Sequence, residues 1–216
     1  VQKEFGPIQI QSGRMAEQMV QVAHRVDHKM PWHWPVPAYL VTKGLGSGLW
    51  LLLSLAMLTD SLPAGGMLAV WGGALATVGL LATTALLVLD LDRPERFLRI
   101  LTRPQWKSWL VKGAFILVGL STVTGVWLGL ELGTSIGWWE AAAVEPLRTP
   151  LAWLTLPLSI GGAIYTAFLF AQCEGRDLWQ SPLLGPHLLV HALMMGAVGL
   201  ILLGLLGVGG PWVTAG

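Results

Sequence analysis

The residues in this sequence best suited to chemistry are polar side chains that lie inside long apolar segments. Lys43, Lys112 and His191 each lie about one and a half helical turns after the start of such a segment. Tyr165 lies about two turns before the end of another, and Asp90 closes a further one. Ionisable groups in apolar surroundings are costly and usually serve a function. If the segments are helices that cross a membrane, these groups form one layer near the same face.

The types and spacing of these groups suit a quinone ring. Tyr39 and Lys43 are four residues apart and share a helix face. Lys, His or Tyr side chains can donate hydrogen bonds to quinone carbonyl oxygens, while Asp or His191 can exchange protons during reduction. Gly44 and Gly48 would allow a neighbouring helix or a flat ligand to approach closely.

Each of these residues also has an ordinary structural interpretation. Lys43 and Lys112 have stems long enough to carry their ammonium groups to the lipid headgroups. Tyr165 could belong to the aromatic belt at the membrane interface, which is the expected place of several tryptophans. Those tryptophans are Trp106, Trp109 and Trp179. The coincidence of so many polar groups at one depth favours a site.

The elements that position this layer are five apolar segments. Of the 216 residues, 54% are hydrophobic and 12% charged, and the mean hydropathy is +0.63. A soluble domain has about 25% charged residues, so we expect an all-α integral membrane protein, a bundle of about five transmembrane helices. Proline and glycine pairs bound the segments and place the spans at about 38–58, 67–89, 108–131, 150–172 and 186–208. In this interpretation Pro146 and Pro150 precede the fourth span.

The positive charges fall almost entirely on one side of the predicted bundle. Nearly all of the 13 Lys and Arg residues lie on the side of the N-terminus, whereas Arg148 is alone on the far side and Lys43 lies within a span. The positive-inside rule predicts a cytoplasmic N-terminus in a multi-pass bacterial or archaeal cell (inner) membrane. A cationic face built to hold a partner would give the same bias. The net charge of +1 argues against nucleic-acid binding.

Two regions are expected along the chain. Met15, Met19, Val22 and Val26 recur at helical spacing and predict an amphipathic helix on the membrane or against a partner. We therefore divide the chain into a peripheral N-terminal segment, 1–31, and a transmembrane bundle, 32–210. The chain begins at Val1 rather than Met, so upstream processing or truncation is open.

The connection between the second and third spans holds the most specific motif. It contains Asp90-Leu91, Asp92, Arg93-Pro94 and Arg96-Phe97. A carboxylate at a helix C-terminus is unfavourable beside the negative end of the helix dipole, so Asp90 should have a cationic partner. The other interpretation is an anchoring loop whose charges are solvated at the headgroups.

This connection resembles the D-L-x-R-P-x-R-F element of the NrfD/PsrC (polysulfide reductase) family of quinone-interacting membrane subunits. Further matches in order are Trp34-Pro35, Ala38-Tyr39-Leu40 with glycines 44, 46 and 48, Ser108-Trp109 with Gly113-Ala114-Phe115, Tyr165-Thr166, and Leu178-Trp179 with Ser181-Pro182-Leu183-Leu184. Together they cover about residues 32–200. Family members commonly have eight or more spans, so this chain is a short member or part of a longer one. Asp92 replaces a residue that is often Gly or His, and Lys43 interrupts a helix usually rich in small residues; both could retune the site or indicate another ligand.

The resemblance implies a membrane anchor that exchanges electrons between a quinone (menaquinone or ubiquinone) and an iron–sulfur partner. The single cysteine, Cys173, cannot hold a cluster, so a ferredoxin-like subunit would carry the clusters beside a molybdenum-type or other catalytic subunit. The candidate quinone-binding residues are Tyr39, Lys43, Asp90, Asp92, Arg93, Lys112, Tyr165 and His191. The candidate docking residues are Arg96, Arg99, Arg103 and Lys107. We expect no metal site or catalytic residue in this chain.

Two other functions stay open. A b-type cytochrome needs axial histidines on facing helices, but only His187 and His191, one turn apart, are clearly associated with a span. We therefore do not expect haem. A transport or proton-conducting subunit without a redox ligand should carry ionisable groups through the full membrane depth. The far half offers essentially Glu131, near a helix end.

Overall fold

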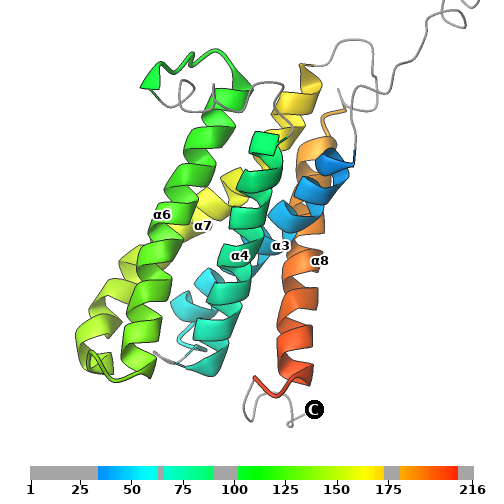
Figure 1. Cartoon of the computed structure of the whole chain (residues 1–216). Coiled ribbons are helices and arrows are strands. Elements are labelled where there is room, and N and C mark those ends of the chain that lie inside the picture. Colours follow the sequence, from blue (N-terminus) through cyan, green and yellow to red (C-terminus); the bar gives the residue numbers. More distant parts are fainter. Residues whose placement is uncertain (1–33, 63–65, 90–101, 173–180, 209–216) are drawn as a thin grey trace, which may run out of the picture. The chain divides into compact units, whose positions relative to one another are not determined.

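The computed structural model describes residues 34–62, 66–89, 102–172 and 181–208. Within these residues the chain is helical and contains no strand. The helices are α3 (Pro35–Leu58), α4 (Met67–Leu89), α6 (Trp109–Ser135), α7 (Ala141–Ala171) and α8 (Leu184–Leu205) (Figure 1). The peripheral segment predicted at 1–31 lies outside the described residues.

All five helices are long and apolar enough to cross a bilayer, which confirms the predicted class. Their ends match the prediction except around one turn. The sequence predicts a fourth span that starts near residue 150, but α7 begins at Ala141, and α6 continues to Ser135. Pro146 and Pro150 therefore lie inside α7 rather than before it. Each proline omits one bond to the carbonyl four residues earlier, a loss that a membrane helix packed in a bundle tolerates.

The ends of three helices form the same hydrogen-bonded cap. In α6, Gly137 adopts φ 79°, its N–H donates to Thr134 O (3.2 Å), and the Trp138 N–H donates to Gly133 O (2.8 Å). This pair of bonds defines a Schellman motif, for which a residue with positive φ is required. Gly207 after α8 and Asp60 after α3 close those helices in the same way. All three caps lie at one end of the bundle, opposite the starts of α3, α6 and α8; we call it the far end and the other the near end (Figure 1).

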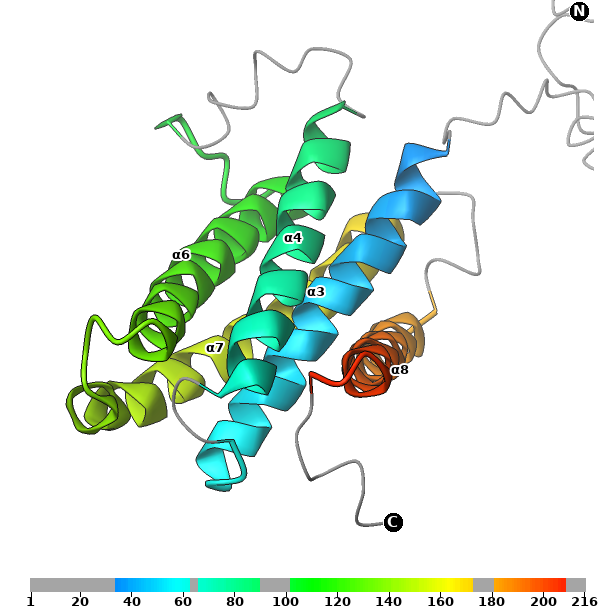
Figure 2. The same ribbon diagram turned by 60° about the horizontal axis from the view of Figure 1, so that its bottom comes forward.

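Helix α3 lies at the centre of the bundle. It packs against α4, α7 and α8, and Figure 2 shows it between α4 and α8. The crossing with α8 brings backbone against backbone, because a methyl group on Gly48 would overlap the carbonyl of Ala192, and one on Gly196 would overlap that of Gly48. Small residues at helix crossings are typical of membrane bundles.

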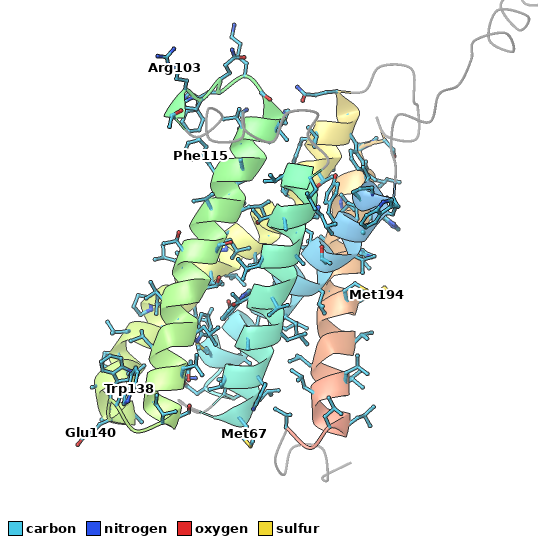
Figure 3. The ribbon with its side chains drawn as sticks, in the orientation of Figure 1. Met67, Arg103, Phe115, Trp138, Glu140 and Met194 are labelled. Carbon is cyan, nitrogen blue, oxygen red and sulfur yellow. The ribbon has the colours of Figure 1, made fainter. Side chains whose placement is uncertain are left out.

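Large apolar side chains cover the outside of the bundle. Val78, Leu81, Ile201 and Met194 are exposed, and Met194 points away from the other helices in Figure 3. The interior, by contrast, holds serines, threonines and charged residues beside its apolar core. This distribution suits a protein whose solvent is lipid, since apolar surface is not penalised there.

Candidate functional site

Lys43 lies in the interior of the bundle at the near end. Only 2% of the residue is exposed. Its ammonium donates hydrogen bonds to Ala163 O (3.0 Å) and Thr166 Oγ1 (2.5 Å), both on α7. No carboxylate among the described residues lies within 4.0 Å of this ammonium. The alternative that Lys43 extends to the headgroups is therefore wrong, because its charge points into the protein.

Tyr165 lies beside this ammonium. The centre of its ring is 4.9 Å from Lys43 Nζ, and the residue is 1% exposed. The ring packs against Gly113 of α6, where a methyl group would overlap it. The Tyr165 hydroxyl has no partner of normal hydrogen-bond geometry among the described residues. Tyr165 is thus a residue of the bundle interior and not of the interfacial belt.

Tyr39 and His191 complete this part of the near layer. Tyr39 is 2% exposed and precedes Lys43 by one helical turn. The imidazole of His191 packs against α3, and a Cβ on Gly44 would lie 2.9 Å from its Cε1 and Nδ1 atoms. The Gly44 and Gly48 pair therefore admits a neighbouring helix, α8. Together, Tyr39, Lys43, Tyr165 and His191 form what we call the near cluster.

Lys112 lies outside the near cluster. Its ammonium is 4.3 Å from the centre of the Trp109 ring, which stacks on Phe168 at 4.3 Å with an angle of 13° between the rings. Phe168 is 41% exposed on the outside of α7. Lys112 thus points to a different side of α6 from its neighbour Gly113, against which Tyr165 packs. The sequence position alone could not separate the two lysines.

The remaining predicted residues are only partly described. Asp90, Asp92, Arg93, Arg96 and Arg99 lie outside the described residues. Arg103 and Lys107 are exposed at the near end, and Arg103 projects beyond the start of α6 in Figure 3. Their positions are compatible with contact to a partner at that face.

The near cluster gathers polar groups whose chemistry suits carbonyl oxygens. An ammonium has three N–H donors, of which Ala163 and Thr166 take two. The Tyr165 hydroxyl and the His191 imidazole add groups that donate and accept hydrogen bonds. No group of three His, Cys, Asp or Glu side chains that could hold a metal occurs among the described residues.

A second buried polar cluster, which the sequence did not predict, lies near the far end. Arg148 of α7 donates from Nε to Glu131 Oε1 of α6 (2.8 Å), and Trp127 Nε1 donates to the same oxygen (3.2 Å). Glu131 is 0% and Arg148 5% exposed. Arg148 also contacts Glu145 (3.4 Å), whose side chain is 55% exposed. We call these four residues the far cluster.

The far cluster overturns the expectation that the far half of the membrane offers essentially Glu131. The prediction failed because it placed residues 132–149 in a loop, where Arg148 would be solvated, whereas Arg148 lies within α7. The useful signal was the turn itself. Glu131 lies in the last two turns of α6 and Arg148 in the first turns of α7, so in an antiparallel pair of helices joined by a short turn their opposite charges could have been paired.

The comparisons with known proteins agree with the helical architecture. The family model described as NrfD, polysulphide reductase, matches residues 23–210. A putative dimethyl sulfoxide reductase membrane subunit from Halobacterium salinarum is 31% identical over 144 residues, covering 60% of this chain and 33% of that protein. A polysulfide reductase chain from Wolinella succinogenes is 28% identical over 188 residues, covering 81% of this chain and 58% of that protein. The sequence thus spans between a third and three fifths of these relatives. No solved structure gives a significant match.

Proposed function

Because this chain belongs to the NrfD polysulphide reductase family of membrane subunits, we propose that it anchors a multi-subunit oxidoreductase and exchanges electrons between a membrane quinone and an iron–sulfur partner. The relatives, one named as a membrane subunit of a dimethyl sulfoxide reductase and the other as part of a polysulfide reductase, support the role of an anchor. The quinone and the partner are our proposal for this chain.

The observation that carries the quinone site is the buried ammonium of Lys43. It has neutral acceptors and no carboxylate nearby in the described part of the chain. Such a charge is expensive to bury unless it meets a compensating group. A quinone carbonyl oxygen can accept a hydrogen bond from the third N–H of the Lys43 ammonium. The positive charge then stabilises the electron density that reduction adds to that oxygen.

The other members of the near cluster supply binding and proton exchange. The Tyr39 and Tyr165 rings wall the site, and the Tyr165 hydroxyl is an available donor or acceptor. His191 lies beside Gly44, where its imidazole can exchange a proton with a reduced ring. Asp90, Asp92 and Arg93 remain predicted members of the site.

The iron–sulfur partner is expected at the near end. Cys173 is the only cysteine of the chain and cannot hold a cluster alone. Arg103 and Lys107 are exposed at that end and, with the predicted Arg96 and Arg99, offer a cationic surface for an acidic partner. A molybdenum-type or other catalytic subunit would attach through this partner.

The test of the quinone site uses variants in the intact complex. Lys43→Met keeps the length of the side chain and removes its charge, and Tyr39→Phe and Asp90→Asn remove single polar groups. For Lys43→Met we expect quinol-dependent turnover to fall at least about tenfold, since a hydrogen bond to a charged group contributes about 1.5–3 kcal/mol. Complex assembly and activity with an artificial electron donor that bypasses the membrane subunit should persist.

Thr77→Val is the matched control for these variants. Its hydroxyl bonds back to Gly73 O (2.8 Å) within α4, away from the near cluster, so turnover should be unchanged. If Lys43→Met, Tyr39→Phe and Asp90→Asn all kept wild-type quinol turnover, the assignment of the site would be rejected. Docking has its own test: Arg103→Glu combined with Lys107→Glu should reduce co-purification of the iron–sulfur subunit, and unchanged co-purification would contradict the proposed surface.

A further inference from the structure

Three buried serine and threonine hydroxyls in the described part of the bundle differ from the other serines and threonines. Most serines and threonines here bond back to a carbonyl one turn earlier in their own helix, as Thr83, Thr124 and Ser54 do at 2.6–2.7 Å. The hydroxyls of Ser47, Thr155 and Ser159 do not. All three residues are 0% exposed, and none of these oxygens has a hydrogen-bond partner among the described residues. Buried polar groups without partners are rare and call for an explanation.

These hydroxyls lie along one line between the two polar clusters. On α7, Arg148, Thr155, Ser159 and Thr166 follow each other at intervals of seven, four and seven residues, which keeps them on one helix face. The stripe is about 27 Å long at 1.5 Å per residue, close to the roughly 30 Å thickness of the hydrocarbon core. Ser47 joins it from α3, because its Oγ lies 3.1 Å from where a Cβ on Gly162 would stand.

Both ends of this line carry charge. At the near end, Lys43 bonds to Thr166, the last residue of the stripe. At the far end, Arg148 bonds to the buried Glu131 and contacts Glu145, which is 55% exposed. The stripe thus leads from a carboxylate at the far surface to the proposed quinone site.

We propose that Ser47, Thr155 and Ser159 form a proton-conducting row, bridged by water, between the far cluster and the near cluster. A hydroxyl both donates and accepts hydrogen bonds, so it can relay a proton in either direction. One water that bridges two hydroxyls at about 2.8 Å each spans about 5.6 Å, which matches the roughly 5.4 Å of one helical turn. Between Thr155 and Arg148, two turns apart, more than one water is needed.

The row is closed in this structure, and that fits its role. Its oxygens are enclosed by α3, α6 and α7, so the waters that bridge them are cut off from bulk solvent until these helices separate slightly. A row that was always open would discharge the membrane potential. The inference rests on the proposed function, because each quinol oxidised at the near cluster releases two electrons to the partner and two protons, and each quinone reduced takes up the same number.

The test is proton transfer during turnover in liposomes that contain the intact complex and a pH-sensitive dye in the lumen. A membrane-impermeant acceptor or donor outside selects complexes whose far end faces the lumen. In the wild type, quinol oxidation should acidify the lumen and quinone reduction should make it alkaline. The variant Thr155→Val/Ser159→Ala should lose this signal per electron transferred, because its protons exchange with the outer solution instead.

Thr124→Val/Ser54→Ala is the matched control. It removes the same two chemical groups from residues that are equally buried but bonded within their own helices, and its proton signal should equal that of the wild type. An unchanged lumenal signal per electron in Thr155→Val/Ser159→Ala would overturn the row while leaving the quinone site intact. Absence of quinol turnover in the wild type would instead reject the proposed function.

A second measurement does not depend on turnover. Hydroxyl radicals generated from bound water by X-ray pulses modify side chains next to that water. Trp50 and Trp127 are 0% and 2% exposed, their rings are 5.0 Å apart, and Trp127 bonds to Glu131. We expect both to be modified in the wild type, and less so in Thr155→Val/Ser159→Ala. Complete protection of both tryptophans in the wild type would overturn the row.

Discussion

The near and far clusters each bury a cation, but they treat its charge in opposite ways. Arg148 is paired with Glu131 at 2.8 Å and contacts Glu145. Lys43 is bonded only to a carbonyl and a hydroxyl within the described part of the chain. A buried charge with a counter-ion can be explained by folding alone, since each partner offsets the desolvation of the other. A buried charge with neutral partners costs stability, so its retention points to function.

The largest effect is expected when the far pair is broken. Arg148→Met or Glu131→Gln leaves the other member buried without its main partner, and such losses cost about 3–5 kcal/mol. The double variant Glu131→Gln/Arg148→Met should recover most of this loss, because it leaves no uncompensated charge. Denaturant titration of the purified protein in detergent measures the free energy of unfolding. Single variants as stable as the wild type would show that the pair does not hold α6 against α7.

The same measurement on Lys43→Met should give the opposite sign. Removing a charge that only neutral oxygens compensate should leave the free energy of unfolding unchanged or raise it by about 1–3 kcal/mol, since an apolar side chain of similar volume avoids the desolvation penalty. Thr166 can then bond back within its own helix. A loss as large as that of Arg148→Met would erase the contrast between the clusters and would indicate a structural role for Lys43.

A third effect comes from the glycine that supports Tyr165. Gly113→Ala places a methyl group where the Tyr165 ring lies and should cost about 1–3 kcal/mol through overpacking. Gly129→Ala is the control in the same helix, because no atom lies within 4 Å of its would-be Cβ. There we expect a gain of about 0.5–1 kcal/mol from the better helix former. Equal losses in both variants would show that Tyr165 does not depend on this contact.

The sequence was sufficient for the fold class and for the depth of the near cluster. The five apolar segments carry the class, and counting residues from the ends of the spans brings Tyr39, Lys43, Tyr165 and His191 to one end. Depth alone, however, does not say which way a side chain points. Lys43 and Lys112 lie at similar depths, yet only Lys43 faces the interior. The direction is set by helix rotation, which depends on packing such as that of Gly48 against α8.

The far cluster was missed for a different reason. Sequence rules treat proline as a helix boundary, so Pro146 and Pro150 led to a predicted fourth span that starts too late and leaves out Arg148. In the bundle, the ion pair with Glu131 and the Schellman cap at Gly137 fix a short turn, and α7 tolerates the missing hydrogen bonds near its start. Tertiary contacts outweighed the local proline signal there. They bury charges in the far half, whereas the sequence predicted a polar layer only in the near half.

The smallest effect is expected for Lys112, the second lysine of the near layer. It tests whether the direction of a lysine side chain or its depth in the membrane decides its role. Lys112→Ala removes an ammonium that lies over the ring of the half-buried Trp109, a contact of about 0.5–1 kcal/mol where it is not desolvated. Quinol-dependent turnover should stay within about twofold of the wild type, since about 0.5 kcal/mol corresponds to little more than a factor of two. Lys43→Met, measured in the same preparation, supplies the contrasting loss. If Lys112→Ala reduced turnover as strongly as Lys43→Met, the depth of a lysine rather than its burial would mark the site, and the near cluster would have to include the Trp109 face of α6.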